Sequence, residues 1–135
     1  MPTEKSKYPI SHMRSKNLLE SFRFAFSGLW YALRTQRNTR IHLIITFLVI
    51  GIGLWLRISP VEWALLTLTI GFVLVSEMLN TVAETLVDMI SPGYHPLAKV
   101  MKDVTAGAVL LGAIIAVLVG LLILGPPLWV QVFGG

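Results

Sequence analysis

The residues with the clearest chemical potential gather between Glu77 and Asp103. This segment holds four of the chain's seven carboxylates, which are Glu77, Glu84, Asp88 and Asp103. On an α-helix, at about 100° per residue, the first three of these and Asn80 share one face over about 16 Å of axis. A polar stripe next to a membrane-length apolar run is costly to build, so it indicates a functional site.

The residue types of this segment favour a site for a metal ion and a phosphate. Mg²⁺ is usually held by one or two carboxylates together with substrate phosphates. Lys102 could bind a phosphate, and a carboxylate could take the proton from an attacking hydroxyl. The chain contains no GxxxxGK[ST] loop and no kinase GxGxxG with its partner motifs. Any nucleotide site is therefore of another design.

Each of these polar residues also has a structural interpretation. Glu84 and Asp88 could be solvated or paired with basic residues near the helix end, and Asn80 could join two helices by hydrogen bonds. His95 alone would most often be an interfacial loop residue. Glu77 is different, because an unpaired carboxylate deep in an apolar helix is expensive, and this favours a functional role.

Composition predicts an all-α membrane protein with room for one domain. The 135 residues are 55% hydrophobic and only 13% charged, with a mean hydropathy of +0.75. The apolar residues occur in long blocks, as in proteins that cross the membrane several times. There is no cysteine, which excludes disulfides and thiolate metal sites. The net charge of +4 comes from basic residues crowded into the first forty positions, which indicates anionic lipid headgroups and no nucleic acid.

The pattern divides the chain into a tail, a surface helix and three membrane spans. Residues 1–16 are polar and basic and are expected to form a flexible cytoplasmic tail. The remaining ranges are a surface helix at 17–40, spans at 41–57, 63–90 and 103–124, and a C-terminal tail at 125–135. The apolar runs have roughly the 17–25 residues that a span needs, once their flanks are added.

The predicted surface helix has apolar residues at three- and four-residue spacing and arginines beside them, which is typical of a helix in the membrane interface. Arg23 and Arg34 fall on one side of this helix, and Trp30 lies beside the apolar stripe. These three residues are candidates for contact with a lipid substrate. The alternative is that the arginines bind the phosphates of ordinary membrane lipids.

The basic residues also predict the orientation of the chain. Eight of them precede the first span and two follow the second span, whereas the loop between the first two spans has only Arg57. By the positive-inside rule the N-terminus lies in the cytoplasm and the C-terminus outside, with the chain in the inner (cytoplasmic) membrane. The acidic stripe then lies at the cytoplasmic end of the second span, where nucleotides are found.

The combined motifs resemble a known family. The run E-x-x-N-T-x-x-E-x-x-V-D, followed by Y-H-P-L-A-K and K-D-x-x-A-G-A-V-L, is similar to the small bacterial integral-membrane lipid kinases that phosphorylate diacylglycerol or undecaprenol. The similarity covers residues 17–124. The upstream A-L-R-T-Q-R-N-T-R-I-H segment and the H-P-L-A-K wording resemble the undecaprenol kinase branch more closely.

This resemblance implies a homotrimer with active sites shared between subunits, which transfers the γ-phosphate of ATP to a lipid hydroxyl with Mg²⁺ as cofactor. It implies that Glu77 is the general base, Asn80 a supporting amide and Glu84 a metal ligand. The residues implied on the ATP side are Glu84, Asp88, Tyr94, His95, Lys102 and Asp103.

The chain departs from the family pattern at two positions. Gln36 stands where the family usually has a second metal-binding glutamate, and a neutral amide oxygen is a weaker Mg²⁺ ligand than a carboxylate. Gly93 stands where a glutamate usually precedes the Tyr94–His95 pair, which removes a possible nucleotide contact. Neither change touches Glu77 or Lys102, so we expect activity to survive.

Four functions compete at this point. A kinase of undecaprenol is the main prediction, and a kinase of diacylglycerol or another lipid alcohol is the second. The third is a proton- or cation-conducting assembly that uses the acidic stripe as a relay, but the outer half of the second span offers only two threonines for a polar path. The fourth is an accessory subunit that only packs against partners, which leaves Glu77 unexplained.

Overall fold

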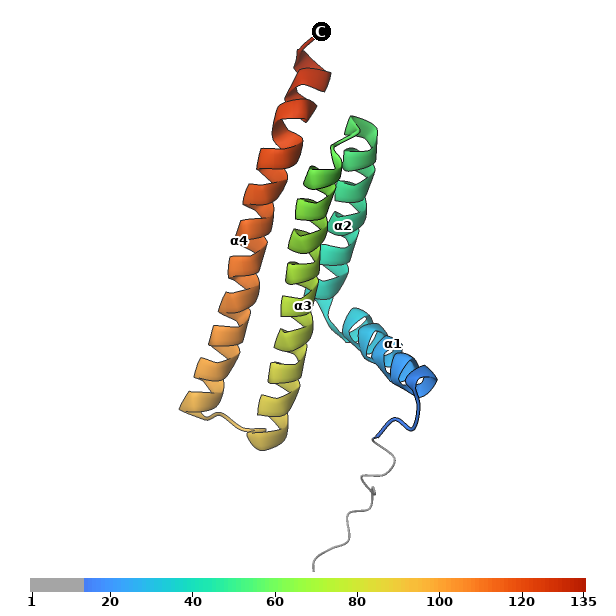
Figure 1. Cartoon of the computed structure of the whole chain (residues 1–135). Helices are drawn as coiled ribbons and strands as arrows, with labels where there is room; N and C mark the ends of the chain where they lie inside the picture. Colours follow the sequence, from blue (N-terminus) through green and yellow to red (C-terminus); the bar gives the residue numbers. More distant parts are fainter. Residues whose placement is uncertain (1–13) are drawn as a thin grey trace, which may run out of the picture.

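The computed structural model describes residues 14–135 and contains four helices, so the predicted all-α class is confirmed. They are α1 (Leu18–Thr35), α2 (Arg37–Leu56), α3 (Pro60–Ile90) and α4 (Pro96–Phe133). Helices α2, α3 and α4 run side by side, while α1 lies obliquely beside the end that carries the α3–α4 loop (Figure 1). Most of the predicted tail, residues 1–13, lies outside the described residues.

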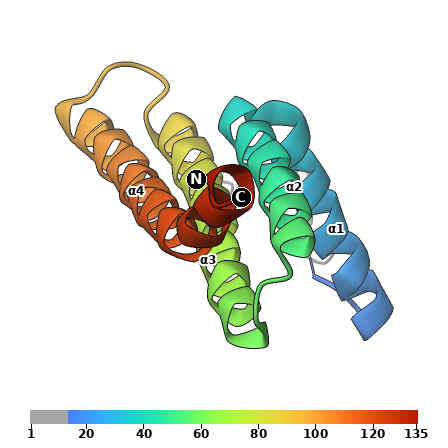
Figure 2. The same cartoon turned by 90° about the horizontal axis from the view of Figure 1, so that it is seen from above.

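Helices α2, α3 and α4 are each long and apolar enough to cross a membrane, which confirms the three predicted spans. Viewed along the bundle, α3 lies between α2 and α4 (Figure 2), and it packs most extensively on α4. The oblique helix α1 exists as predicted, but its position at a membrane surface stays a prediction. Helix α3 therefore has a neighbour on each side.

The predicted surface helix is shorter than residues 17–40. Asn17 caps the start of α1 by accepting a hydrogen bond from the Glu20 N–H at 2.9 Å. At Gln36 the backbone becomes extended (φ −103°, ψ 115°), and its N–H closes α1 on the Ala32 carbonyl. Since Gln36 is also the N-cap of α2, residues 37–40 belong to the first span and not to the surface helix.

The turn between α2 and α3 follows local sequence rules. Arg57 ends α2 in the left-handed conformation (φ 52°). The Ser59 side chain accepts from the Glu62 N–H at 3.3 Å, and the Glu62 carboxylate accepts from the Ser59 N–H at 2.7 Å. This capping box and Pro60 at the first position begin α3 three residues before the predicted 63.

Helix α4 extends beyond the predicted third span, 103–124, at both ends. It begins at Pro96 because Nδ1 of His95 accepts from the Leu97 N–H at 3.1 Å and caps the helix. At the other end it continues through Pro126 and Pro127 to Phe133, where residues 125–135 were predicted to be a tail. An apolar environment offers no water to the backbone, so a continued helix is the stable form even next to prolines.

The buried core of a single chain is small. Leu66, Ile123 and Leu124 form a buried cluster at the end of the bundle away from the α3–α4 loop, with apolar residues of α2 around it. Gly112 of α4 approaches α3 closely, since a Cβ placed there would lie 3.2 Å from the Phe72 ring. Most large apolar side chains are exposed, as expected of a chain surrounded by lipid or by other membrane helices.

Candidate active site

Glu77 is the most deeply buried large side chain of the described chain. Only 1% of its surface is exposed, although it lies in a helix that is apolar around it. Its Oε1 atom is 3.1 Å from Nε2 of His42 on α2. The imidazole N–H does not point at this oxygen, so the contact is electrostatic and is not an aligned hydrogen bond. A buried carboxylate is thus held next to one imidazole.

Two further polar groups lie one helical turn toward the α1 end of the bundle. Because α2 and α3 run in opposite directions, Thr39 on α2 and Asn80 on α3 are at about the same level there. The Asn80 amide N–H donates to the Glu84 carboxylate at 3.3 Å. The Asn80 Oδ1 and Thr39 Oγ1 atoms are buried without a hydrogen-bond partner. The predicted stripe therefore continues as a polar line from Glu77 to Glu84.

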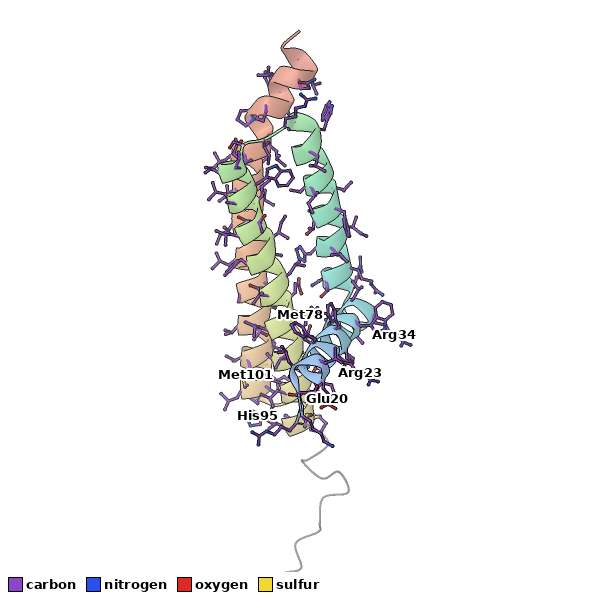
Figure 3. All side chains as sticks on the ribbon, turned by 45° about the vertical axis from the view of Figure 1, so that its right-hand side comes forward. Glu20, Arg23, Arg34, Met78, His95 and Met101 are labelled. Atoms are coloured by element: carbon purple, nitrogen blue, oxygen red, sulfur yellow. The ribbon has the colours of Figure 1, made fainter. Side chains whose placement is uncertain are left out.

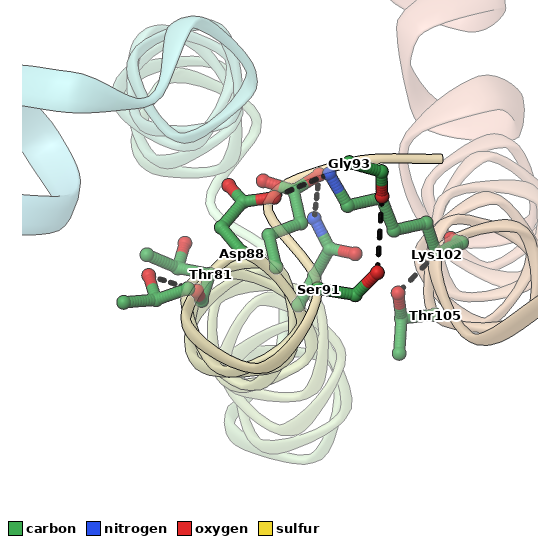
Figure 4. A network of polar contacts seen from close by, with 9 residues as sticks. Thr81, Asp88, Ser91, Gly93, Lys102 and Thr105 are labelled. Carbon is green, nitrogen blue, oxygen red and sulfur yellow. Dashed lines mark hydrogen bonds and ion pairs between the residues drawn. The ribbon is translucent and has the colours of Figure 1, made fainter. Parts of the chain in front are cut away.

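Most of the predicted nucleotide residues lie around one open pocket of about 330 Å³ at the α3–α4 loop. Across this loop Lys102 Nζ contacts the Asp88 carboxylate at 2.6 Å (Figure 4). The lining residues are Asp88, Ser91, Pro92, Gly93, Tyr94, His95, Ala98, Lys99 and Lys102. Four of the six predicted ATP residues thus share this pocket, while Glu84 lies one turn along α3 from Asp88.

The other two ionic residues at this end pair with each other. Lys99 Nζ contacts the Asp103 carboxylate at 2.5 Å, one turn apart on α4. Asp103 does not line the pocket, so its predicted role at ATP stays a prediction. His95 uses Nδ1 as an acceptor for the helix cap, so its neutral ring carries hydrogen on Nε2. That N–H can donate to an anion.

The predicted lipid contacts on α1 are exposed and do not meet Glu77 of the same chain. Arg23 and Arg34 project from the side of α1 that faces away from α3 and α4 (Figure 3), and Trp30 has 62% of its surface exposed. Whether these residues contact a substrate stays a prediction.

The residues near Glu84 fit a metal ion that takes most of its ligands from a substrate. Within residues 14–135 there is no group of three His, Cys, Asp or Glu side chains that could hold a metal. Glu84 could supply one carboxylate, whereas Asn80 turns its amide N–H, and not its Oδ1, toward that carboxylate. One carboxylate with phosphate and water ligands is a usual arrangement for Mg²⁺. The Gln36 side chain makes no capping hydrogen bond at its helix junction.

His42 was missed when the site was predicted from the sequence, because a neutral histidine was counted as part of an apolar span. Thr39 was also missed, because it lies in the segment that was assigned to the surface helix. A polar side chain inside a span is by default a functional candidate, and this rule would have found His42.

Comparisons with known proteins decide the family. The family model described as prokaryotic diacylglycerol kinase matches residues 23–124. The chain belongs to the prokaryotic diacylglycerol kinase family. This confirms the family predicted from the motifs, and it places the polar line on α3 and the α3–α4 pocket inside the matched region.

Among its relatives, the chain is 49% identical over 113 residues to a diacylglycerol kinase of Synechocystis. It is 41% identical over 109 residues to the undecaprenol kinase of Bacillus subtilis, and 29% identical over 101 residues to the diacylglycerol kinase of Escherichia coli K12. These matches cover 83%, 81% and 75% of this chain, and 65%, 89% and 83% of the respective relatives. The chain thus spans somewhat less than two thirds of the Synechocystis relative. Relatives named as kinases of lipids support the predicted enzyme class.

Proposed function

We propose that this chain transfers the γ-phosphate of ATP to the hydroxyl group of a lipid alcohol, most simply undecaprenol, to give undecaprenyl phosphate. The observation that carries this proposal is the buried carboxylate of Glu77, on the same helix face as a polar line that leads to the Lys102 pocket. A base buried in a membrane span can reach the hydroxyl of a lipid, whereas the exposed pocket can receive a nucleotide.

Each residue has a stated role in this reaction. The Glu77 carboxylate accepts the proton of the lipid hydroxyl. At the same time the oxygen of that hydroxyl attacks the γ-phosphorus of ATP, and ADP leaves. Lys102 and the His95 Nε2–H bind phosphate oxygens, while Asp88 and Tyr94 line the nucleotide pocket. Asn80 supports the site between Glu77 and Glu84.

Mg²⁺ is the cofactor that fits these residues. Glu84 would hold the ion together with ATP phosphate oxygens, and Gln36 would add a weak amide ligand. When bound, the ion neutralises part of the phosphate charge as the phosphoryl group transfers. The protein thus supplies fewer of the metal ligands than it would in a site made only of protein groups.

Two lipids are candidates for the acceptor, because the relatives are named after different lipid substrates. The Synechocystis relative is named diacylglycerol kinase, and the Bacillus subtilis relative is named undecaprenol kinase. We place undecaprenol first because the Bacillus relative matches over most of its own length and because the R-I-H and H-P-L-A-K segments resemble that branch. Diacylglycerol, giving phosphatidate, is the second candidate.

The deciding experiment is phosphate transfer from labelled ATP by purified protein in mixed micelles, with undecaprenol and diacylglycerol offered side by side. We expect a preference for undecaprenol, and a fall of about a hundredfold or more in Glu77→Gln, as for loss of a general base. Preference for diacylglycerol would keep the mechanism and change the acceptor. No transfer to either lipid by folded protein would contradict the proposed function.

We further propose that the chain works as a homotrimer in the inner membrane, with the N-terminus in the cytoplasm and active sites shared between subunits. The exposed lipid-contact candidates on α1 support this arrangement, because they are turned away from Glu77 of their own chain. Light scattering of the detergent-solubilised protein should give the mass of three 14.9 kDa chains. A mass of one chain in an active preparation would contradict the trimer.

A further inference from the structure

His42 is the ionisable side chain that meets Glu77 within the described chain. The Nε2···Oε1 distance of 3.1 Å is a hydrogen-bond distance, although the N–H direction is not yet aligned. Catalytic hydrogen bonds are often poorly aligned without substrate and tighten in the reacting complex. A small rotation of the imidazole ring would therefore turn this contact into a hydrogen bond.

The other helices offer Glu77 no alternative partner. Helix α4 has no ionisable side chain between Val104 and Phe133, and at the level of Glu77 it presents Gly112, which approaches Phe72 and Ser76. On α3 the next ionisable side chain toward the loop is Glu84, which has the same charge as Glu77. The charged residues of α1, which are Glu20, Arg23 and Arg34, have no ion pair with Glu77.

The face of α2 around the histidine is largely shielded from the surroundings. The His42 side chain is 21% exposed. One turn away on the same helix, Thr39 is buried with a partner-free hydroxyl. The face of α2 that meets Glu77 is therefore polar at two successive turns, which packing alone does not require.

We propose that His42 is a positioning residue for Glu77. Its Nε2–H donates to one carboxylate oxygen, and this contact turns the second oxygen toward the hydroxyl of the lipid. No bond to His42 forms or breaks, since the proton passes from the alcohol to Glu77. This inference rests on the proposed function. It adds α2 to the helices that position the catalytic base.

Three substitutions of His42 test the role. His42→Leu removes the donor, His42→Gln places an amide N–H near the position of Nε2, and His42→Asn has the same amide but is too short to reach Glu77. We expect kcat to fall about tenfold to a hundredfold in the Leu and Asn variants, as for a misplaced catalytic group, with the KM values for ATP and lipid little changed. The Gln variant should recover most of kcat.

A double-mutant cycle shows whether His42 acts through Glu77. In the Glu77→Gln background, adding His42→Leu should cost little further rate, because the group that it positions is already disabled. Wild-type rates in the Leu and Asn variants, equal losses in Asn and Gln, or fully additive losses would each overturn the inference. Activity of the wild-type chain is measured first, since its absence would count against the proposed function and not against His42.

Discussion

At the scale of single residues, the charged groups of the site differ in how firmly they are held. Glu77 is buried beside His42, and such a carboxylate costs stability unless it is compensated. Lys102 and Asp88 form an exposed pair, and exposed pairs contribute little to stability. A phosphate can therefore compete with Asp88 for Lys102. The buried Glu77 carboxylate, in contrast, stays next to His42.

The junction residue Gln36 gives a prediction at this scale. We expect Gln36→Glu to lower the Mg²⁺ concentration for half-maximal rate, because a carboxylate binds this hard cation better than an amide oxygen does. The measurement is a Mg²⁺ titration of lipid phosphorylation at saturating ATP. Asn38→Asp, which adds the same charge at an exposed position two residues away, is the matched control. An unchanged or higher requirement in Gln36→Glu would count against a place for residue 36 near the metal.

At the scale of elements, the contact between α2 and α3 sets the position of the base. The two helices are joined by the short turn at residues 57–59, which the capping box of Ser59 and Glu62 fixes. Beside this turn Gly53 lies against the Trp63 ring, because a Cβ at Gly53 would be 2.8 Å from the ring carbon Cη2. The register that brings His42 to Glu77 depends on this close packing.

Substitution of this glycine tests the packing. We expect Gly53→Ala to lower the free energy of unfolding by about 1–3 kcal/mol relative to Gly51→Ala, which gains the same methyl group with no neighbour within 4 Å. Both substitutions gain the same helix propensity, so their difference reports the contact. Thermal unfolding in detergent, followed by tryptophan fluorescence, measures it. Equal transition temperatures for the two variants would contradict the close approach.

At the scale of the whole molecule, one chain buries few of its apolar side chains. Large hydrophobic residues are exposed along all four helices. Helix α4 reaches beyond the α2–α3 turn to the tilted ring pair of Trp129 and Phe133, whose centroids are 4.6 Å apart. Exposed apolar surface of this extent needs an apolar environment such as lipid. Within residues 14–135, the basic residues other than Arg57 are gathered at the opposite end, around α1, the start of α2 and the α3–α4 loop.

The orientation of the molecule can be read with single cysteines, since the natural chain has none. We expect Gly135→Cys to react with a membrane-impermeant thiol reagent in right-side-out vesicles, and Gly93→Cys to react in inside-out vesicles, because the basic loop stays in the cytoplasm. The cysteine-free chain is the control for background labelling. The reverse pattern would contradict the proposed orientation.

The sequence by itself determined the class of the molecule and predicted the residues of a site. Apolar blocks of span length predicted the three spans, and spacing on one helix face predicted the polar line from Glu77 to Asp88. The motifs predicted the family. These features are local, since they depend on residues within a few turns of one helix. They could be found without knowing which helices meet.

The tertiary structure decided the helix boundaries and the partners across helices. The cap at His95, the break at Gln36 and the continuation through Pro126 depend on side-chain geometry or on an environment that a pattern does not contain. The meeting of His42 with Glu77, and of Lys102 with Asp88, depends on the relative register of antiparallel helices. Register is set by packing between helices, such as Gly53 against Trp63 and Gly112 against Phe72, and spacing along one helix does not reveal it.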